Sequence, residues 1–350
     1  MARQSKMLEE ILEQPRALEK TLRAELKPTL RLREQFARKR PKFIILAARG
    51  TSDNAAQFGR YLLEMATGIP VSLAAPSIFT LYGAQFNFED TLVVAISQSG
   101  ESTDTNLVLE RAKAAGVFTI GVTNEPDSSL AKLADHVILV RAGREKSVAA
   151  TKTYTGQLLA MYLLAFALGG RNLDLDHLRQ LPDLAAVALQ TQADISARAS
   201  RYRFMDHTVV VGRGLNYANA FEFALKLMET CYVVAERFSS ADFLHGPIAM
   251  VSPRFPVFLF APSGVTWPSI SGMVDRLTTL GAESLLVTDK ANPSAGKSAH
   301  RAIVLNAKIE ELYTPIPYII PAQLFAAYLA SEKGLNPDQP RALEKVTKTM

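Results

Sequence analysis

The chain has 350 residues, of which 48% are apolar, a formal net charge of +5 and one cysteine, Cys231. This length suits two domains of average size, each able to bury a core. One cysteine excludes an internal disulfide and a cysteine-rich zinc site. With an N-terminus too charged for a signal peptide, it predicts a cytoplasmic protein.

The first 40 residues predict a helical arm, broken near Pro15 and Pro28. The densest basic run, Arg31 to Lys42, ends this arm. A solvated helix face explains the run more simply than a nucleic-acid patch, so no nucleic acid is expected as a partner. The longest apolar stretch, Leu158 to Gly169, is too short to span a bilayer and predicts a buried helix rather than a membrane segment.

The chain then repeats itself. Five short segments recur in the same order at a separation of about 165 residues, which indicates an internal duplication. The pairs are Arg49-Gly50 with Arg213-Gly214, Ser99-Gly100 with Ser263-Gly264, Thr123-Asn124 with Thr288-Asp289, 134–140 with 299–305, and 157–163 with 323–329.

Each half alternates apolar strands with helices, which predicts an α/β fold of two parallel sheets, each with helices on both faces. We expect the first subdomain at 41–170, a helical linker at 171–205, the second subdomain at 206–335 and a tail at 336–350. In such sheets ligands bind beyond the carboxyl ends of the strands.

The most informative segment runs from Thr91 to Gly116. An apolar run ending at Ile96 predicts a buried strand, a helical pattern ends at Gly116, and small hydroxyl and amide residues lie between them. Such a turn offers backbone N–H groups, hydroxyls and the positive end of a helix dipole, which suit a phosphate dianion. The plainer interpretation is a polar turn with Ser99 or Ser102 as the helix N-cap.

Neither a Walker motif nor Gly-x-Gly-x-x-Gly is present at this turn, so a small phosphate ester is a better candidate than ATP or NAD, and no cofactor is expected. The second half has lost the corresponding hydroxyl residues. We therefore expect one phosphate pocket, in the first half.

The second half carries candidate acid–base groups. Glu222, Lys226 and Glu229 fall on one face of a predicted helix, where an exposed Glu–Lys pair is the plain alternative. His245 lies in a Gly-Pro turn, exposed enough to exchange protons at neutral pH. The remaining histidines are interpreted as structural: His136, His177, His207 and His300.

The C-terminal segment contains Lys345. A frayed tail is the default for such a segment. A lysine that folds over a pocket would instead supply an amine able to form an imine.

Six motifs together resemble the SIS (sugar isomerase) family, most closely the isomerase half of glucosamine-6-phosphate synthases. The resemblance covers about residues 43–350. The motifs are Arg49-Gly-Thr-Ser52, Ser97-Gln-Ser-Gly-Glu101, Val148-Ala-Ala-Thr-Lys152, Ala224-Leu-Lys-Leu-Met-Glu229, His245-Gly-Pro247 and Asp338-Gln-Pro-Arg341.

The resemblance implies two tandem flavodoxin-like subdomains that bind a sugar phosphate without a metal, in a homodimer with a shared active site. It implies that Glu229 moves a proton between C1 and C2 with Lys226 beside it. His245 would open the sugar ring from the partner subunit, and Lys345 would bond the open-chain carbonyl. The implied substrate-binding residues are Thr51, Ser52, Ser97, Gln98, Ser99, Ser102 and Val148.

The sequence also departs from the synthase pattern. Met1-Ala2 opens the arm where a synthase has a glutaminase domain, so we expect no ammonia from glutamine. Ala150, Met228 and Leu244 replace a serine and two lysines, which bears on the choice of substrate. The resemblance then favours a stand-alone deaminase that converts glucosamine 6-phosphate to fructose 6-phosphate and ammonia. The alternatives are a fructosamine-6-phosphate deglycase, an isomerizing aminotransferase-like enzyme and a non-catalytic sugar-phosphate sensor.

Overall fold

The computed structural model describes residues 5–298, 301–343 and 345. It contains two five-stranded parallel sheets. The first sheet has the order β2-β1-β3-β4-β5 and the second, read from the matching edge, has the order β7-β6-β8-β9-β10. Each half thus has the flavodoxin-like order 2-1-3-4-5, which confirms the predicted duplication and fold class.

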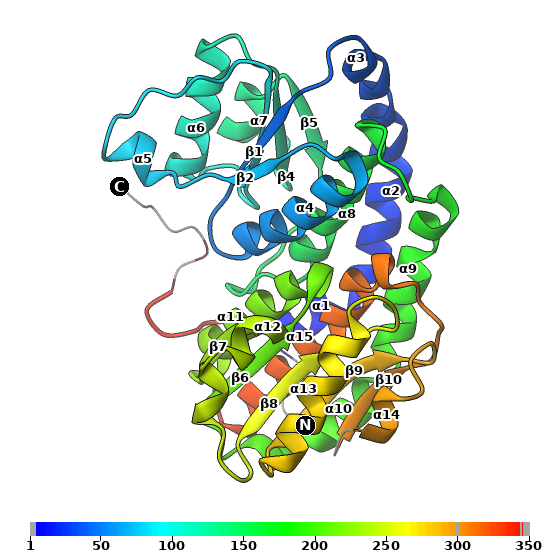
Figure 1. The fold of residues 1–350 in the computed structure, drawn as a ribbon. Coiled ribbons are helices and arrows are strands. Elements are labelled where there is room, and N and C mark those ends of the chain that lie inside the picture. Colours follow the sequence, from blue (N-terminus) through cyan, green and yellow to red (C-terminus); the bar gives the residue numbers. More distant parts are fainter. Residues whose placement is uncertain (1–4, 299–300, 344, 346–350) are drawn as a thin grey trace. The chain divides into compact units, whose positions relative to one another are not determined.

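The strands are short and follow the apolar runs of the sequence (Figure 1). They are β1 Phe43–Ala47, β2 Val71–Leu73, β3 Thr91–Ile96, β4 Thr119–Thr123, β5 His136–Leu139, β6 His207–Gly212, β7 Val234–Ser239, β8 Pro256–Phe260, β9 Glu283–Asp289 and β10 Arg301–Leu305.

The α-helices connect these strands and form the N-terminal arm. They are α1 Lys6–Leu12, α2 Gln14–Leu30, α3 Leu32–Arg38, α4 Thr51–Thr67, α5 Ser77–Thr80, α6 Thr103–Ala114, α7 Ser129–Leu133, α8 Lys152–Ala167, α9 Leu175–Leu189, α10 Gln192–Ala199, α11 Tyr217–Cys231, α12 Ser240–Leu244, α13 Trp267–Thr279, α14 Ala295–Ser298 and α15 Pro315–Glu332. Four short 3₁₀ segments are η1 Ser200–Tyr202, η2 Gly214–Asn216, η3 Pro247–Met250 and η4 Glu311–Tyr313.

The first sheet is buried on both faces. Ile45, Val93 and Ala95 point to one face and pack with Phe79 of α5 and Leu109 of α6 in one apolar cluster. Alternate residues of the same strands, among them Ile44, Leu46 and Val94, are also fully buried, as a strand covered on both faces requires. Helices α4 and α8 pack against each other, and every residue of α8 is buried, so the apolar run at 158–169 is a buried helix as predicted.

The second sheet repeats this arrangement. Val209, Val211 and Leu259 pack with Met273 and Leu277 of α13 on one face. On the other face the Phe258 ring meets Phe223 of α11 and Phe325 of α15, with centroids 5.0 and 4.9 Å apart. The duplication extends to the turns before corresponding strands. Asp90 lies one residue before β3 and Arg254 lies two residues before β8, and both have a positive φ, 53° and 68°.

The arm differs in detail from the prediction. Its first break lies at Glu13, near Pro15 as expected. The second lies at Arg31 rather than at Pro28, because α2 continues to Leu30 with Pro28 inside it.

Packing divides the chain into two compact units. The unit of the first sheet comprises 16–145, 152–179 and 343–350, and the unit of the second sheet comprises 1–15, 146–151 and 180–342. The division cuts the predicted arm between Pro15 and Arg16 and the predicted linker between Arg179 and Gln180. Among the described residues, no helix has both the length and the apolar character that crossing a bilayer requires.

Candidate functional site

The first group of candidate residues follows β3 at the carboxyl edge of the first sheet. The segment 97–102 turns from the strand into α6, and Ser102 is the N-cap, accepting a hydrogen bond from Thr105 N at 3.5 Å. This outcome confirms one part of the plain interpretation, that Ser102 caps the helix. The Ser102 hydroxyl also lies 3.0 Å from Thr105 Oγ1, and either oxygen can donate in that hydrogen bond. When Thr105 donates, the Ser102 O–H proton is available to a ligand.

The serines of this turn also hold its backbone. Ser97 Oγ accepts from Gly100 N at 3.1 Å and Ser99 Oγ accepts from Glu101 N at 3.3 Å. Two backbone N–H groups that we expected to be open to a ligand are therefore bonded within the turn. The serine hydroxyl protons and the positive end of the α6 dipole are two features of this turn that suit an anion.

Gly100 is required where it stands. Its φ is +68°, and a Cβ there would lie 2.2 Å from Ser128 Oγ. The turn is thus fixed from inside by close packing, which holds the serine hydroxyls in one arrangement.

The second group lies where β1 turns into α4. Gly50 is the N-cap with φ 57°, and Thr51 and Ser52 open the helix. The Ser52 hydroxyl is buried and accepts from Gln157 Nε2 of α8 at 2.9 Å. Since β1 and β3 are neighbours in parallel register, Ala47 opposite Ala95, the two turns emerge at the same edge, at the switch in strand order where ligands bind in such folds.

An ion pair that the sequence analysis missed joins the two turns. Arg49, after β1, donates to Asp104 Oδ2 in the first turn of α6 from Nη2 at 2.8 Å and from Nε at 3.1 Å. Nearby in α4, burial raises the pKa of Asp53, opposed by the charge of Arg49. The ion pair makes this edge less repulsive to an anion than its acidic residues suggest.

The acid–base candidates lie on α11 in the unit of the second sheet. Lys226 Nζ is 2.5 Å from Glu229 Oε2 and 3.4 Å from Glu222 Oε1. The side chains of Glu222 and Lys226 are 0% exposed, and that of Glu229 is 22% exposed. The three residues share a helix face as predicted, but the face is buried, so the alternative of a solvated Glu–Lys pair is wrong.

This arrangement gives Glu229 a defined position. A lysine fully enclosed by protein holds one carboxylate oxygen, while part of the Glu229 side chain reaches solvent. A carboxylate with one oxygen fixed and a partly open face is suited to moving a proton on a bound molecule.

His245 follows α12 as its C-cap and is exposed, as expected from the Gly-Pro turn. Its backbone N–H donates to Asp242 O at 3.1 Å. Gly246 follows with φ 148°. Of the histidines interpreted as structural, His136 opens β5 and burial lowers its pKa, whereas His300 lies outside the described residues.

Lys345 lies in the unit of the first sheet. Its Nζ is 3.4 Å from Oε2 of Glu145, whose side chain is fully buried. Thr153 at the start of α8 donates to the same carboxylate from Oγ1 at 2.6 Å and from its backbone N at 3.3 Å. The sequence analysis missed Glu145, which its burial and its contacts with Thr153 and Lys345 identify.

Val148 lies in the unit of the second sheet, where its N–H donates to Asp338 O at 3.4 Å. The predicted site residues therefore form two sets. Thr51, Ser52, Ser97, Gln98, Ser99, Ser102 and Lys345 belong to the first unit, and Val148, Lys226, Glu229 and His245 belong to the second. No cluster of three or more metal-ligating side chains occurs within the described ranges.

Comparison with known proteins gives consistent matches. The SIS domain family matches residues 39–167 and 204–333. The glutamine--fructose-6-phosphate aminotransferase [isomerizing] of Gloeobacter violaceus is 37% identical in an alignment of 354 positions that covers 97% of this chain and 58% of the relative. The chain thus spans a little over half of the length of such relatives.

Solved structures agree on the fold. The C-terminal domain of glucosamine-fructose-6-phosphate aminotransferase from Francisella tularensis is 29% identical with a TM-score of 0.86, covering 97% of this chain and 99% of that domain. The glucosamine-6-phosphate deaminase from Thermotoga maritima shares the fold, with a TM-score of 0.78 at 24% identity over 99% of this chain and 100% of the other. With a matched segment in each half and the same sheet topology in both, the chain belongs to the SIS domain family.

Proposed function

We propose that the chain is an amino-sugar phosphate isomerase that converts glucosamine 6-phosphate to fructose 6-phosphate and ammonia. The observation that carries this proposal is the buried Lys226 that fixes one oxygen of Glu229 at 2.5 Å. The names of the similar proteins, which are isomerizing aminotransferases, support a sugar phosphate as substrate.

In the proposed reaction, His245 assists ring opening, which frees the aldehyde at C1. The Glu229 carboxylate then takes the proton from C2 and returns it to C1, while an N–H proton passes to O1, so that C1 becomes an alcohol and the C2–N bond becomes a C=N bond. The Lys345 amine adds to this carbon and ammonia leaves, and water then hydrolyses the Lys345 imine, which frees the lysine and leaves a ketone at C2. One base that serves two adjacent carbons is sufficient for this transfer.

The phosphate would be held at the carboxyl edge of the first sheet. Ser97, Ser99 and Ser102 would donate their hydroxyl protons, and Thr51 and Ser52 would contribute from the adjacent turn. Gln98 and Val148 would contact the sugar. Several hydroxyl donors at the start of a helix are an arrangement that suits a phosphate dianion.

The direct test is an ammonia-release assay over a panel of amino-sugar phosphates. Glucosamine 6-phosphate should give stoichiometric ammonia and fructose 6-phosphate. Preference for a fructosamine 6-phosphate would favour the deglycase, and binding of sugar phosphates without turnover would favour the sensor. Either of these two results would contradict the proposal.

The second candidate is an isomerizing aminotransferase-like activity, which the names of the similar proteins favour. The chain spans 57–58% of the length of those relatives. The deaminase and the aminotransferase-like activity differ in the use of glutamine as a source of nitrogen, so an assay with glutamine distinguishes them. The chain should make no glucosamine 6-phosphate from fructose 6-phosphate and glutamine. Such synthesis by the purified chain alone would refute the deaminase assignment.

We also propose a homodimer in which His245 completes the site of the neighbouring subunit. Glu229→Gln and His245→Ala should each be inactive alone. After mixing and subunit exchange they should recover part of the activity, because a mixed dimer has one site with both residues intact. Absence of recovery after proven exchange would place both residues in the site of one subunit.

A further inference from the structure

A cavity of about 680 Å³ lies in the unit of the first sheet, away from the candidate site. Three segments line it: 35–41 at the end of α3, 86–92 before and at the start of β3, and 115–118 between α6 and β4. All three precede strands of a parallel sheet, so the cavity lies at the amino edge. The serine turn follows β3 at the carboxyl edge, a strand length of roughly 15–20 Å away.

The walls of the cavity are aromatic. Phe36 and Phe118 meet edge to face with centroids 6.2 Å apart, and both line the cavity. Phe86 is 43% exposed although its ring lies 4.8 Å from that of Phe79 and 6.0 Å from that of Phe88. A flat apolar molecule placed here would cover aromatic surface that water now contacts, which favours binding.

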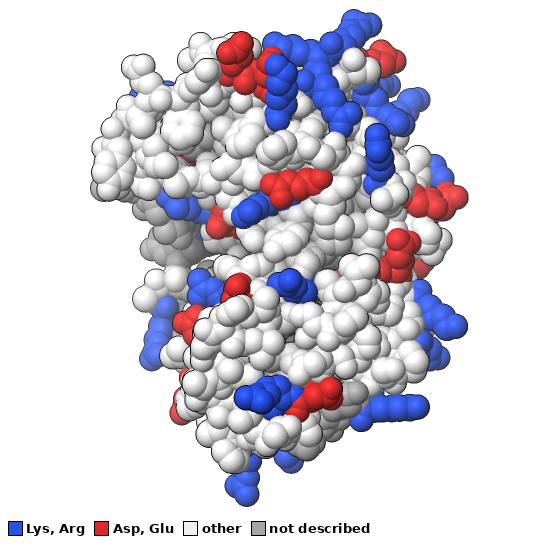
Figure 2. Space-filling view, in the orientation of Figure 1, with Lys and Arg blue, Asp and Glu red and all other residues white. Residues whose placement is uncertain are grey.

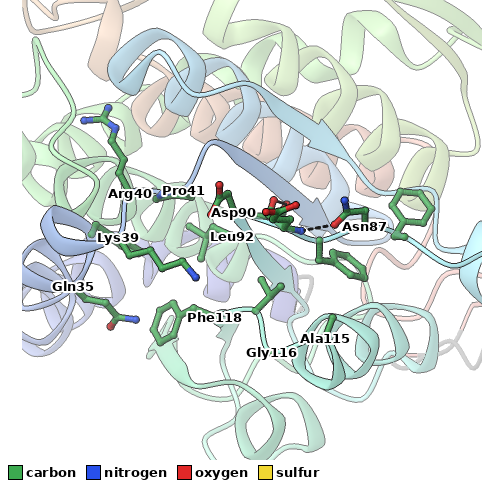
Figure 3. Close-up of a pocket in the computed structure, with 16 residues that line it drawn as sticks. Gln35, Lys39, Arg40, Pro41, Asn87, Asp90, Leu92, Ala115, Gly116 and Phe118 are labelled. Carbon is green, nitrogen blue, oxygen red and sulfur yellow. Dashed lines mark hydrogen bonds between the residues drawn. The ribbon is translucent and has the colours of Figure 1, made fainter.

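The polar groups at the cavity include donors on Gln35, Lys39 and Asn87 besides the carboxylates of Glu89 and Asp90. The basic side chains that follow Arg31 gather over α3 in the unit of the first sheet (Figures 1 and 2). Figure 3 shows the Lys39 side chain extending toward Phe118, with Gln35 beside it. Asn87 Oδ1 accepts from Glu89 N at 2.9 Å, which leaves its amide N–H groups as donors.

The charged side chains at the cavity are Lys39, Arg40, Glu89 and Asp90, and Lys42 pairs with Asp90, so that three positive and two negative charges leave a net charge of +1. Asp90 pairs with Lys42 at 2.7 Å, and that hydrogen bond is the main reason why the pKa of the Asp90 carboxyl is lowered. The charge of Lys39 lowers this pKa less. Arg40 donates to the carbonyl oxygen of Thr67 at 2.7 Å, which leaves its charge uncompensated. Within the described part of the chain no ion pair joins Lys39 to a carboxylate. One negative charge on a ligand would be matched here.

We propose that this cavity is a second ligand site, which binds an amphipathic organic monoanion with a flat apolar body. Its volume falls in the range of small-molecule sites, and its aromatic walls with a few convergent donors fit that class of ligand. The site is distinct from the proposed sugar-phosphate pocket and does not depend on the reaction proposed above.

The test uses two fluorescent probes of similar shape, the anion 8-anilinonaphthalene-1-sulfonate and the uncharged N-phenyl-1-naphthylamine. The full chain should bind one equivalent of the anion, about tenfold more tightly than the uncharged probe. Lys39→Gln should remove this preference, and Phe86→Ser should weaken both probes several-fold. Both side chains are exposed, so the variants should fold, which the thermal transition verifies. Arg38→Gln, an exposed arginine on the same helix outside the cavity lining, is the matched control and should behave as the wild type.

Three results would overturn the proposal. The first is unchanged binding of both probes in both variants. The second is an equal affinity for the charged and uncharged probes in the wild type. The third is complete displacement of the anion by excess fructose 6-phosphate, since that would place the probe in the sugar-phosphate pocket.

Discussion

Replacing Lys226 with methionine should destabilise the unit of the second sheet strongly. The lysine side chain is 0% exposed and holds Glu222, also 0% exposed, at 3.4 Å and Glu229 at 2.5 Å. Methionine nearly preserves the volume but removes the charge, so Glu222 keeps a buried carboxylate without its cation. Breaking a buried ion pair in this way costs about 3–5 kcal/mol. At 2–4 °C per kcal/mol, the expected fall in melting temperature is roughly 6–20 °C.

The measurement is urea unfolding followed by far-ultraviolet circular dichroism for the wild type, Lys226→Met, Glu222→Gln and the double variant. The double variant should recover most of the lost free energy of unfolding, because it contains neither buried charge. A loss below about 1 kcal/mol in Lys226→Met would refute the reasoning, as would a double variant no more stable than the single one.

Three further predictions concern the other candidate groups. Ser97→Ala and Ser99→Ala should each raise KM for the sugar phosphate with a cost of about 1–3 kcal/mol, and normal binding by calorimetry in the double variant would place the phosphate elsewhere. Glu145→Gln should remove a group that positions the Lys345 amine. The yield of the adduct between Lys345 and fructose 6-phosphate, trapped with borohydride, should therefore fall by on the order of tenfold while the affinity for the sugar phosphate stays unchanged. An unchanged yield would show that Glu145 does not position this amine. Cys231 is buried and burial raises its pKa to about 11, so a thiol reagent at pH 8 should modify it only after unfolding, and rapid labelling of the native chain would contradict this.

The sequence was sufficient to predict the two sheets. The run Leu92–Ile96 is all apolar, which specifies a strand buried on both faces, and the structure places β3 at Thr91–Ile96. The recurrence of segments about 165 residues apart then required the second sheet to repeat the first. These signals are local or periodic, and both can be read without three-dimensional information.

Burial and long-range pairing could not be predicted in the same way. Spacing placed Glu222 and Lys226 on one helix face, but whether that face meets solvent depends on how α11 packs against α15 and β7. The pairing of Arg49 with Asp104 joins two turns that are adjacent only because β1 lies beside β3. Glu145 and Thr153 likewise meet through the path of the chain into α8.

The serine turn shows a third limit. Its composition indicated donors for an anion, yet hydroxyl groups also accept, and here Ser97 and Ser99 accept from backbone N–H groups of their own turn. Residue type alone does not show whether a serine hydroxyl bonds to the backbone of its own turn or remains available to a ligand.

The central claim is that Glu229 carries the proton between C2 and C1, and isotope incorporation tests it most directly. In deuterated water the wild type should form fructose 6-phosphate from glucosamine 6-phosphate with label at C1. Glu229→Gln keeps the shape of the side chain but lacks the base, so it should lose about 10²–10⁴-fold in kcat and incorporate no label, at nearly unchanged affinity. Glu236→Gln, at an exposed carboxylate on β7, should match the wild type in both respects. Turnover of Glu229→Gln near the wild-type rate with label still entering C1 would contradict the account and require a different base.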